Sequence, residues 1–473
     1  MRLSQWFTLI AVLVAGRAPA APWIAGPVGT MPATSLPEAS FHHSVSGPGG
    51  FLVVWTSLAP GGADLYGARV APAAGPTTPF PISTATGNQQ DPAAAVTGNH
   101  FVVVWDDDRN QNTVNIYGAR VSFDGGVLEP AGILISGGPN AQKFVPFPAC
   151  SPAECLVVWS ERVMDWNIMG TRVRFDLSPV SGDYFINKGP AGQFTPIVVA
   201  VDGGYFTAWS DDRNGPLLDY RYYASGLDAD GGPFDPLGVE ASPLASSIYD
   251  RSGLADDGSR RWLAFSSLTD AGRVVTVGAF NPGGGLTNSS QFGLPSTNGL
   301  GRTSLTFDGT RLWLAFEVFE LDAGVSVQGL RLFVDGGLED PAPLVMMANA
   351  SNPVLSSDQK GTVLLTAVRS PGALLYQFFS NDNDAGVDAG LADGGRDAGT
   401  MDAGTMDAGT MDAGTIDAGT MDAGTMDAGT SPRRLVVGCG CATAGPAPWI
   451  LLLALSWLNR RRRSRPGFEP NPT

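Results

Sequence analysis

Apolar residues recur along the middle of the chain in short runs, and each run is followed by a segment in which apolar and polar residues alternate. In the second copy of this pattern, the run FVVVW covers 101–105 and the alternating segment NIYGARV covers 115–121. Consecutive apolar positions predict a strand buried on both faces, and alternation predicts a strand nearer the surface. The run ends on an aromatic residue in six copies and on a threonine in the seventh: Trp55, Trp105, Trp159, Trp209, Phe265, Phe316 and Thr366.

Each copy is about fifty residues long and divides into four β-type pieces. In the second copy these pieces are 92–96, 101–105, 115–121 and 133–136, with glycine, asparagine and aspartate between them. Four short strands at this period are typical of a β-propeller blade. Seven copies therefore predict an all-β, seven-bladed β-propeller over residues 21–380. Because the last three copies diverge, an open repeat array and a ring of six or eight blades stay open as alternatives.

The two ends of the repeat region are complementary. The seventh copy has only three strands, because an acidic segment begins at Asn381, whereas residues 23–30 precede the first copy and have no blade of their own. These N-terminal residues stand where a fourth strand falls in the phase of the repeat. We predict that they complete blade seven and so remove the open edge strands that would otherwise aggregate.

The residues after the aromatic position give a family resemblance. The segments DDDRN (106–110) and SDDRN (210–214) are turn-rich hairpin connections. They resemble the VVW-x-D-x-R repeats of bacterial extracytoplasmic propellers, and they are loosely similar to TolB-type propellers, which act through protein–protein contacts in the cell envelope. This resemblance implies the propeller fold and a location outside the cytoplasm.

The N-terminus has the composition of an export signal. Arg2 precedes an apolar stretch at 7–15, and the small residues Ala18 and Ala20 stand before Ala21. This pattern predicts a secretory signal peptide over residues 1–20. An N-terminal membrane helix is the alternative, but the apolar run is shorter than the ~20 residues that span a bilayer.

The C-terminal segment 435–473 contains three elements in order: a cysteine motif, an apolar helix at about 442–459, and a basic cluster. The motif and the cluster consist of Gly438, Cys439, Gly440, Cys441, Arg460, Arg461, Arg462 and Arg463. The segment resembles the MYXO-CTERM sorting signal of myxobacterial surface proteins. That resemblance implies cleavage near Cys439 or Cys441 by a sorting protease of the membrane and transfer to the outer cell surface. An uncleaved transmembrane anchor with its arginines in the cytoplasm is the alternative.

Residues 381–434 are predicted to form a disordered acidic stalk. They consist largely of MDAGT-type repeats, and 381–430 contains eleven aspartates and one arginine. Such a segment has almost nothing to bury and repels itself, so it should stay extended. Fifty flexible residues reach ~40 Å end to end.

Charge excludes some partners. The chain carries a net charge of −16, and this becomes about −22 once the signal peptide (+2) and the tail from Ala442 (+4) are removed. A strongly acidic surface is repelled by phosphate backbones, so nucleic acid is not an expected partner. A glycine- and proline-rich chain with only 16% charged residues also favours an all-β fold over a helical bundle.

Residues suited to catalysis or cofactor binding are scarce. Cys150 and Cys155 lie in ACSPAEC and are predicted to form a disulfide between two strands. The three histidines, with His42 and His43 in the first strand of blade one and His100 in a turn, are interpreted as structural. We therefore predict no catalytic residue and no required cofactor.

Calcium is the one ligand for which weak candidates exist. Asp228 and Asp230 in LDADGG are similar to the start of a calcium loop, and the run 106–108 also offers oxygen ligands. A plain hairpin turn explains the DGG segments equally well. The recurring arginines Arg69, Arg120 and Arg172 are expected to pair with aspartates of their own hairpins.

Two functions from different classes remain. The first is a surface-displayed, non-enzymatic propeller that binds a protein or glycan partner of the cell envelope. The second is an extracytoplasmic, glycosidase-like hydrolase that uses loop carboxylates, because glycosidases need two carboxylates across a cleft. Convergent carboxylates on one face would favour the hydrolase. The short predicted loops favour binding.

Overall fold

The computed structural model describes residues 23–32, 41–110, 113–139, 142–162, 164–215, 220–242, 252–269, 272–293, 297–320 and 324–380. The described residues form the strands β1 to β30. Within these ranges, no helix is long and apolar enough to cross a membrane. The signal peptide, the stalk, the cysteine motif, the apolar helix and the basic cluster that the sequence predicts lie outside the described residues.

The strands form seven antiparallel sheets, and each sheet is one blade. Blade 1 contains β3 (His42–Gly47), β4 (Gly50–Ala59), β5 (Gly62–Ala71), β6 (Gly75–Pro76) and β7 (Phe80–Ser83). Blade 2 contains β8 (Gln89–Val96), β9 (His100–Asp107), β10 (Asn115–Ser122) and β11 (Ile133–Ser136). Blade 3 contains β12 (Lys143–Cys150), β13 (Cys155–Arg162), β14 (Trp166–Val173) and β15 (Tyr184–Asn187).

The remaining four blades follow the same order. Blade 4 contains β16 (Gln193–Val201), β17 (Gly204–Asp211), β18 (Arg221–Asp228) and β19 (Val239–Glu240). Blade 5 contains β20 (Gly253–Asp256), β21 (Arg261–Thr269), β22 (Gly272–Phe280) and β23 (Leu286–Gly293). Blade 6 contains β24 (Thr297–Phe307), β25 (Arg311–Glu320), β26 (Gly324–Phe333) and β27 (Leu344–Ala348). Blade 7 contains β28 (Ser351–Ser357), β29 (Thr362–Arg369), β30 (Ala373–Ser380), β1 (Ile24–Ala25) and β2 (Gly29–Thr30).

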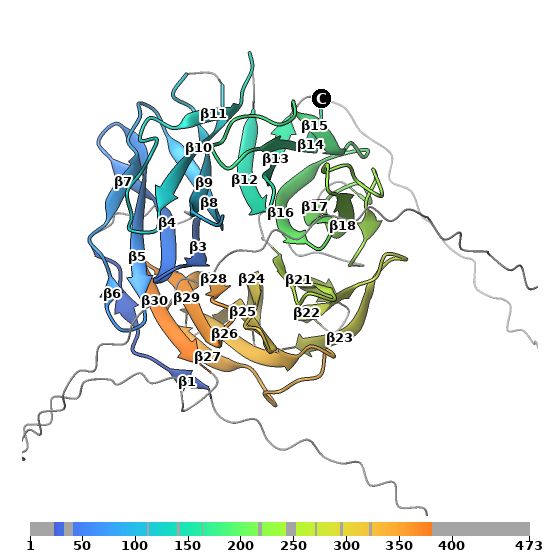
Figure 1. The fold of residues 1–473 in the computed structure, drawn as a ribbon. Coiled ribbons are helices and arrows are strands. Elements are labelled where there is room, and N and C mark those ends of the chain that lie inside the picture. Colours follow the sequence, from blue (N-terminus) through green and yellow to red (C-terminus); the bar gives the residue numbers. More distant parts are fainter. Residues whose placement is uncertain are drawn as a thin grey trace, which may run out of the picture. The chain divides into compact units, whose positions relative to one another are not determined.

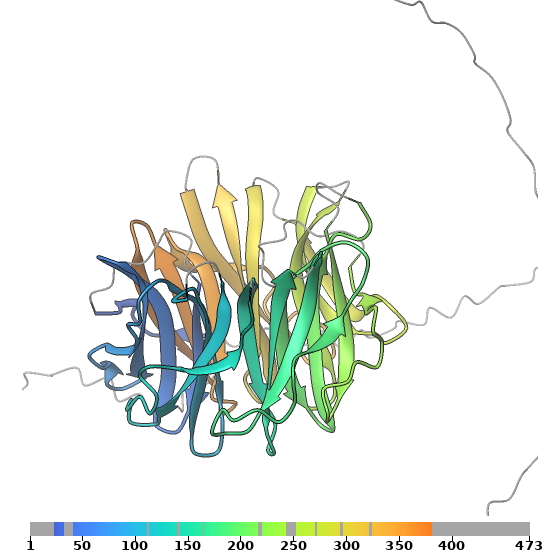
Figure 2. The same ribbon diagram turned by 90° about the horizontal axis from the view of Figure 1, so that it is seen from above.

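The blades are arranged in a closed ring, with the first strand of each blade innermost (Figure 1). These inner strands pack against one another from blade to blade, and the first and last blades meet directly. Ser44 on β3 and Ser356 on β28 join their hydroxyl oxygens in a buried 2.8 Å hydrogen bond. Figure 2, turned by 90°, shows that the strands run up and down along the ring axis. The predicted seven-bladed propeller is confirmed, and the open array and the other blade numbers are excluded.

The N-terminal strands complete blade 7, as predicted. Ile24 lies opposite Ser380 and Thr30 lies opposite Leu375, so β1 and β2 both pair with β30. Trp23 adds an apolar contact, because its ring stacks on Trp313 of blade 6 at 5.3 Å between centroids. The chain therefore closes the ring by hydrogen bonding and by packing.

The second strand of each blade forms the centre of the core. All eight residues of β9 are buried, as the apolar run predicts. The seven anchor positions, from Trp55 to Thr366, are each at most 1% exposed. One detail of the prediction is wrong: His100 is the first residue of β9 rather than part of the turn, because its backbone already pairs with Ser122.

The ring has two faces, which we name by their connections. The AB face carries the turns between the first and second strands of each blade, such as 97–99 in blade 2 and 202–203 in blade 4. The BC face carries the connections between the second and third strands, such as 108–114 in blade 2. Ser380 lies opposite Thr362, at the start of a second strand, so the described chain ends at the AB face.

Candidate binding groove between blades 4 and 5

The repeated DRN segments form structural clusters at the BC face. In blade 2, the carboxylate of Asp107 accepts the indole N–H of Trp105 at 2.9 Å and two bonds from the Arg109 guanidinium. Arg109 also lies over the ring of Tyr117, 4.0 Å from its centroid. Blade 4 repeats this cluster with Trp209, Asp211, Arg213 and Tyr223. Since all these groups are satisfied by one another, the clusters hold the blades together and leave little capacity for a ligand.

Polar side chains of the second strands also link neighbouring blades. Asp106 accepts the backbone N–H of Val145 at 3.2 Å, and Ser160 accepts the backbone N–H of Thr195 at 3.1 Å. Val145 and Thr195 have positive φ angles of 56° and 47° and lie in bulges of the inner strands. Glu317 performs the same task for Asn352 of blade 7. Each bulge thus turns a backbone donor toward the preceding blade.

Two carboxyl groups do converge near the inner strands of blade 2. Asp91 lies in the bulge of β8 with φ 49°, and its side chain hydrogen-bonds Asp106. Burial, and then the nearby negative charge of Asp91, raise the pKa of Asp106 well above its usual range. Asp106 is 3% exposed and already binds the next blade. A glycosidase needs two carboxyl groups that face a sugar across a cleft. Asp106 is buried in the wall of the ring and Asp91 is half-buried beside it, so the pair does not have this arrangement.

His43 and His100 have structural contacts, and His42 is buried at the start of β3. His43 accepts the backbone N–H of Ala94 at its Nδ1, and its ring meets Phe147 edge-on at 5.0 Å. The Nε2 of His100 lies 2.8 Å from the carbonyl oxygen of Phe175, and so joins blades 2 and 3. Burial lowers the pKa of His100 and favours its neutral form.

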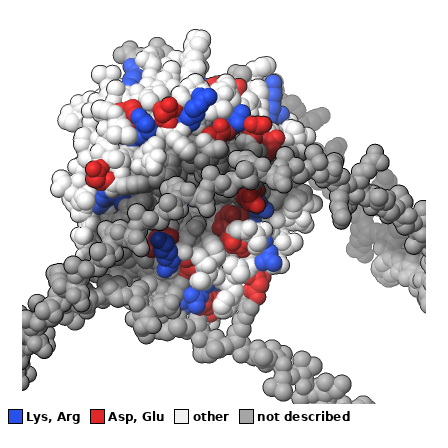
Figure 3. Space-filling view, viewed as in Figure 1, with Lys and Arg blue, Asp and Glu red and all other residues white. Residues whose placement is uncertain are grey.

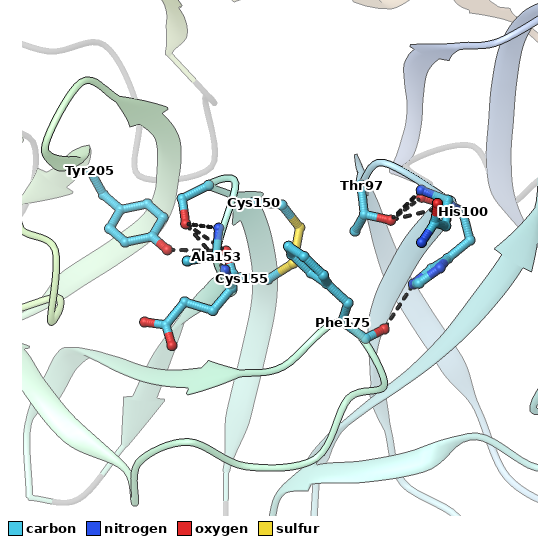
Figure 4. Close-up of a disulfide and its surroundings, with 10 residues drawn as sticks. Thr97, His100, Cys150, Ala153, Cys155, Phe175 and Tyr205 are labelled. Carbon is cyan, nitrogen blue, oxygen red and sulfur yellow. Dashed lines mark hydrogen bonds between the residues drawn. A yellow bond between two sulfur atoms is a disulfide. The ribbon is translucent and has the colours of Figure 1, made fainter. Parts of the chain in front are cut away.

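A short disulfide closes the first hairpin of blade 3. Cys150 on β12 and Cys155 on β13 face each other in register, and their sulfur atoms are bonded (Figure 4). Beside it, the turn is capped by the Ser151 hydroxyl, which accepts the N–H groups of Ala153 and Glu154. The hydroxyl of Tyr205 from blade 4 donates to the carbonyl oxygen of Glu154, so this turn also contacts the next blade.

The recurring arginines lie between blades at the AB face. Each lies on the third strand of its blade. Its pairing partner on the second strand is the residue three positions before the anchor residue of that blade. These arginines are Arg69, Arg120, Arg172 and Arg331. Each fills the space toward the next blade. Arg172, for example, binds Glu154 of its own blade at 2.7 Å and Asp230 of blade 4 at 2.8 Å.

The partners of these arginines differ from the prediction. Arg120 pairs with Glu129 in the connection to β11, and Arg331 pairs with Asp340 at the equivalent place. Arg69 donates to the carbonyl oxygen of Pro48 at 2.7 Å and lies over the ring of Phe101. The expected aspartates of the hairpins are therefore not the general partner. The arginine instead binds whatever acceptor the neighbouring turn or connection provides.

Three blades have no arginine at this position: Ala279 stands there in blade 5, Phe379 in blade 7, and glycine in blade 4. Gly226 stands at the arginine position, opposite Phe206. The carboxylate nine residues later is nevertheless retained, since Asp235 corresponds to Glu129 and Asp340: the N–H of Phe234 bonds the carbonyl oxygen of Gly226 as that of Leu128 bonds Arg120. Among the described residues, Asp235 has no lysine or arginine partner. Its carboxylate accepts the N–H of Leu237 at 3.0 Å.

A groove opens at this place. It has a volume of about 720 Å³ and lies between blades 4 and 5 at the AB face. Phe206 and Phe280 form part of its lining and contact each other at 4.9 Å between ring centroids. Phe234 also lines it and is 74% exposed, which is unusual for an aromatic residue. This size and the apolar, aromatic lining are typical of ligand sites.

The two walls of the groove carry opposite charges. Asp202 and Asp235 come from blade 4, and Arg260 and Arg261 come from blade 5. The arginines are engaged elsewhere, because Arg260 donates to the carbonyl oxygen of Val334 and Arg261 lies 3.6 Å from Asp256. The aspartates of blade 4 are therefore the charged groups most open to a ligand.

The calcium candidates are used by turns and ion pairs. Asp228 accepts the N–H of Gly232 at 2.8 Å, and Asp230 binds Arg172. The three aspartates of 106–108 have separate partners, since Asp108 accepts the backbone and side-chain N–H groups of Asn88. In the described part of the chain, no three histidine, cysteine, aspartate or glutamate side chains gather as a metal site. The structure does not bring the predicted calcium ligands together.

The groove was not predicted from the sequence. Its signal is present, because the fourth copy reads ASGL (224–227) where the second reads GARV (118–121), so glycine replaces the repeated arginine. A substitution in one copy does not show which space the missing side chain would fill. That Asp235 corresponds to the arginine-binding Glu129 and Asp340 is recognised only when the blades are compared in the structure.

Charges of both signs are interspersed among the described residues of one face. On the face seen in Figure 3, lysine and arginine side chains lie beside aspartate and glutamate side chains, with no extended region of one sign. Such a surface offers no basic track of the kind that binds a phosphate backbone.

The comparisons give the chain no family. No family model and no curated protein sequence matches it. Similar solved structures include a protein of unknown function from Dyadobacter fermentans, which is 11% identical over 62% of this chain and 94% of that chain, with a TM-score of 0.43. A subtype N10 neuraminidase-like protein of A/little yellow-shouldered bat/Guatemala/060/2010 is 12% identical over 62% and 94%, with a TM-score of 0.40. An α-L-arabinofuranosidase from Podospora anserina is 12% identical over 64% and 91%, with a TM-score of 0.36. At these values the likenesses carry no argument about activity.

Proposed function

We propose that this protein is an exported, non-enzymatic binding module of the cell surface, and that it takes its partner in the groove between blades 4 and 5. The groove is the observation that carries this proposal. It combines a volume of about 720 Å³, an aromatic lining and the exposed Phe234 at the one described arginine position where glycine removes the side chain. The partner is a protein or glycan of the cell envelope.

The proposal joins the groove to the two ends of the chain. A signal peptide at 1–20 exports the protein, and the segment 435–473 holds it at the membrane or directs it to the outer surface. The described chain ends at Ser380 on the AB face, which also carries the groove. A stalk that reaches ~40 Å leaves this face accessible to large partners.

Binding is favoured over hydrolysis by the state of the carboxylates. Asp106 and Glu317 are buried and bind backbone N–H groups of the next blade. Asp107 and Asp211 bind tryptophan and arginine side chains. None of these four offers a free carboxylate to a sugar.

Site-specific photo-crosslinking in intact cells tests the proposal. A benzophenone amino acid at position 234 should capture a discrete partner, whereas the same probe at Phe185, which is also exposed but lies on the outer strand of blade 3, should not. Equal capture at both positions, or none at 234, would overturn the groove as the binding site. Hydrolysis of chromogenic glycosides by the purified protein, lost on filling the groove, would instead support the hydrolase.

Location is tested separately. Mass spectrometry of the C-terminal peptide, together with protease shaving of intact cells, should find a shaved chain that ends near Cys439 or Cys441. An intact Arg460–Arg463 cluster in the inner membrane would overturn cell-surface sorting, and partners would then be sought in the periplasm.

A further inference from the structure

We propose that the groove recognises an arginine side chain of a partner protein, whose guanidinium group takes the place of the arginine that blade 4 lacks. This inference rests on the proposed binding function and adds the chemistry of the partner. It is argued from the sister blades, where the same site is already occupied by a guanidinium group of the chain itself.

Blades 2 and 6 show what the site binds. Arg120 donates from its backbone N–H and its Nε to the two oxygens of Glu129, at 2.8 and 2.9 Å. Arg331 donates from Nε and a terminal nitrogen to Asp340 at 3.1 and 2.8 Å, and it is 1% exposed. In blade 6 the planar guanidinium thus donates to both oxygens of one carboxylate, a geometry that arginine can form and lysine cannot.

Blade 4 retains the acceptor without the donor. Asp235 stands at the position of Glu129 and Asp340, and Gly226 stands at the position of Arg120 and Arg331. Asp202 adds a second carboxylate from the first turn of the blade, just as Glu154 contacts Arg172 from the first turn of blade 3. The acceptors are thus in place, and the groove lies open beside them.

Two further features fit a guanidinium group that enters from outside. The ring of Phe234 lies over Gly226, since a Cβ atom there would meet its Cδ2 at 2.8 Å. Aromatic rings attract arginine at their faces, as Tyr223 attracts Arg213 at 4.0 Å in the same blade. On the other wall, Arg260 and Arg261 repel a cation, so the guanidinium group is directed toward blade 4.

The acidity of the exported chain supports the same partner. Without the signal peptide and the tail from Ala442 its net charge is about −22, which attracts basic protein segments over a distance, and the groove then provides a defined place for one side chain. A glycan offers no guanidinium group, and for that reason the geometry favours a protein.

The test is a titration of the full exported chain with three small probes: N-acetyl-arginine amide, the lysine analogue, and the citrulline analogue, which keeps the shape of arginine but has no charge. The arginine probe should bind most tightly, and citrulline should bind at least tenfold more weakly, because a hydrogen bond between two charged groups is roughly twice as strong as one from a neutral donor. Equal binding of arginine and citrulline, or lysine binding as tightly as arginine, would overturn the proposal.

Three variants locate the binding site. Asp235→Asn should weaken the arginine probe at least tenfold, whereas Asp124→Asn, which removes an exposed charge from a turn of blade 2, should leave its affinity unchanged. Gly226→Arg combined with Phe234→Leu gives blade 4 the residues that blade 2 has at these two positions, Arg120 and Leu128. The new arginine should occupy the site and abolish probe binding. Unchanged binding in Asp235→Asn would sink the proposal even if the double variant failed to fold.

The two proposals fail in different ways. Partner capture at position 234 without preference for the arginine probe would leave the binding module standing and reject the arginine. Absence of both capture and probe binding would reject the groove altogether.

Discussion

The indole N–H of Trp105 donates a 2.9 Å hydrogen bond to the carboxylate of Asp107, two residues further along β9. The same spacing joins Trp159 to Glu161 at 3.0 Å and Trp209 to Asp211 at 3.1 Å. Blade 1 has Ser57 at this position. Its tryptophan, Trp55, is fully buried, and in the described structure the indole N–H of Trp55 has no acceptor. One residue two positions after the anchor thus decides whether the largest side chain of the blade is satisfied.

Supplying that acceptor should stabilise the propeller. In blade 1, Asp64 lies opposite Ser57, whereas in blade 2 Asn115 lies opposite Asp107. Ser57→Asp combined with Asp64→Asn therefore copies blade 2 without placing two carboxylates face to face. We expect the free energy of unfolding to rise by about 1 kcal/mol, because a buried unsatisfied donor costs about that much or more. Urea unfolding of the purified exported chain measures the change.

The single substitution Ser57→Asp is the control for this prediction. It brings a second carboxylate beside Asp64, whose pKa is already raised by burial. It should give less stabilisation than the pair of substitutions, or none. A double variant that is no more stable than the parent chain would contradict the assignment of Trp55 as an unsatisfied donor.

Removing an existing carboxylate should have a large effect in the opposite direction. Asp211→Ala leaves both Trp209 and Arg213 without their acceptor in a buried position. We expect a loss of about 3 kcal/mol, and a smaller loss for Asp211→Asn, which keeps one oxygen for the indole. Asp230→Asn is the matched control, since Asp230 is an exposed partner of Arg172 and its loss should cost less than about 1 kcal/mol. Similar losses for Asp211→Ala and Asp230→Asn would show that the cluster is not structural.

The carboxyl pair Asp91 and Asp106 in blade 2 gives a pH dependence with a definite sign. The raised pKa of Asp106, caused by burial and by Asp91, keeps this carboxyl protonated in the folded chain at pH values where the unfolded chain has ionised it. The folded state then binds more protons, so its stability falls as pH rises above about 4. Asp107 adds to the negative field, and the backbone N–H of Val145 opposes it.

Asp106→Asn tests this sign. Its amide oxygen still accepts the N–H of Val145 and its NH₂ group donates to Asp91, but it has no proton to lose. The stability advantage of the variant over the parent should therefore be small near pH 4 and should increase toward neutral pH. The measurement is the difference in thermal unfolding midpoint between the variant and the parent chain across this pH range. A difference that does not change with pH would exclude a protonated Asp106.

The fold was predictable from the sequence because the strand pattern repeats in every copy. The groove was not predictable, since it arises where the fourth copy departs from the repeated arginine. Runs such as FVVVW predict a strand buried on both faces, and their spacing predicted seven blades, although the divergence of the last three copies left other blade numbers open until the structure excluded them. The closure followed from a missing fourth strand in the seventh copy. The groove depends on Gly226 in β18 and on the retained Asp235 in the connection to β19, and these two residues are brought to one site only in the folded blade.

The divergent copies show a second limit of the sequence. In blades 5 and 6 the anchor is phenylalanine, and the tryptophans Trp262 and Trp313 stand three residues earlier. Their indole N–H groups bond Asp257 and Asp308, at 2.7 Å in both cases, in the turn of the AB face. The tryptophan–carboxylate pair is thus kept but moved to the opposite end of the strand. An alignment of the repeats shows only that phenylalanine replaces tryptophan at the anchor position.

The disulfide in blade 3 should contribute modestly to stability. It closes a loop between residues only five positions apart, so it removes little entropy from the unfolded chain. We expect Cys150→Ala combined with Cys155→Ala to lower the free energy of unfolding by about 2 kcal/mol while the chain stays folded. The parent chain under reducing conditions should behave like the variant. No shift on reduction, with the bond confirmed by mass spectrometry before treatment, would contradict this expectation.

Closure of the ring by the N-terminal strand is the last prediction. Trp23 packs on Trp313 and on Phe379, so Trp23→Ala should cost about 2 kcal/mol, somewhat less than for a fully buried ring. Removing residues 21–31 goes further, because it leaves the outer edge of β30 without a partner. An open edge strand pairs with other chains, and the truncated protein should dimerise or aggregate in size-exclusion chromatography with light scattering. Leu58→Ala, a substitution at an exposed apolar residue of β4, should change neither property. A truncated chain that remains monomeric with unchanged stability would show that β1 and β2 are dispensable for closing the propeller.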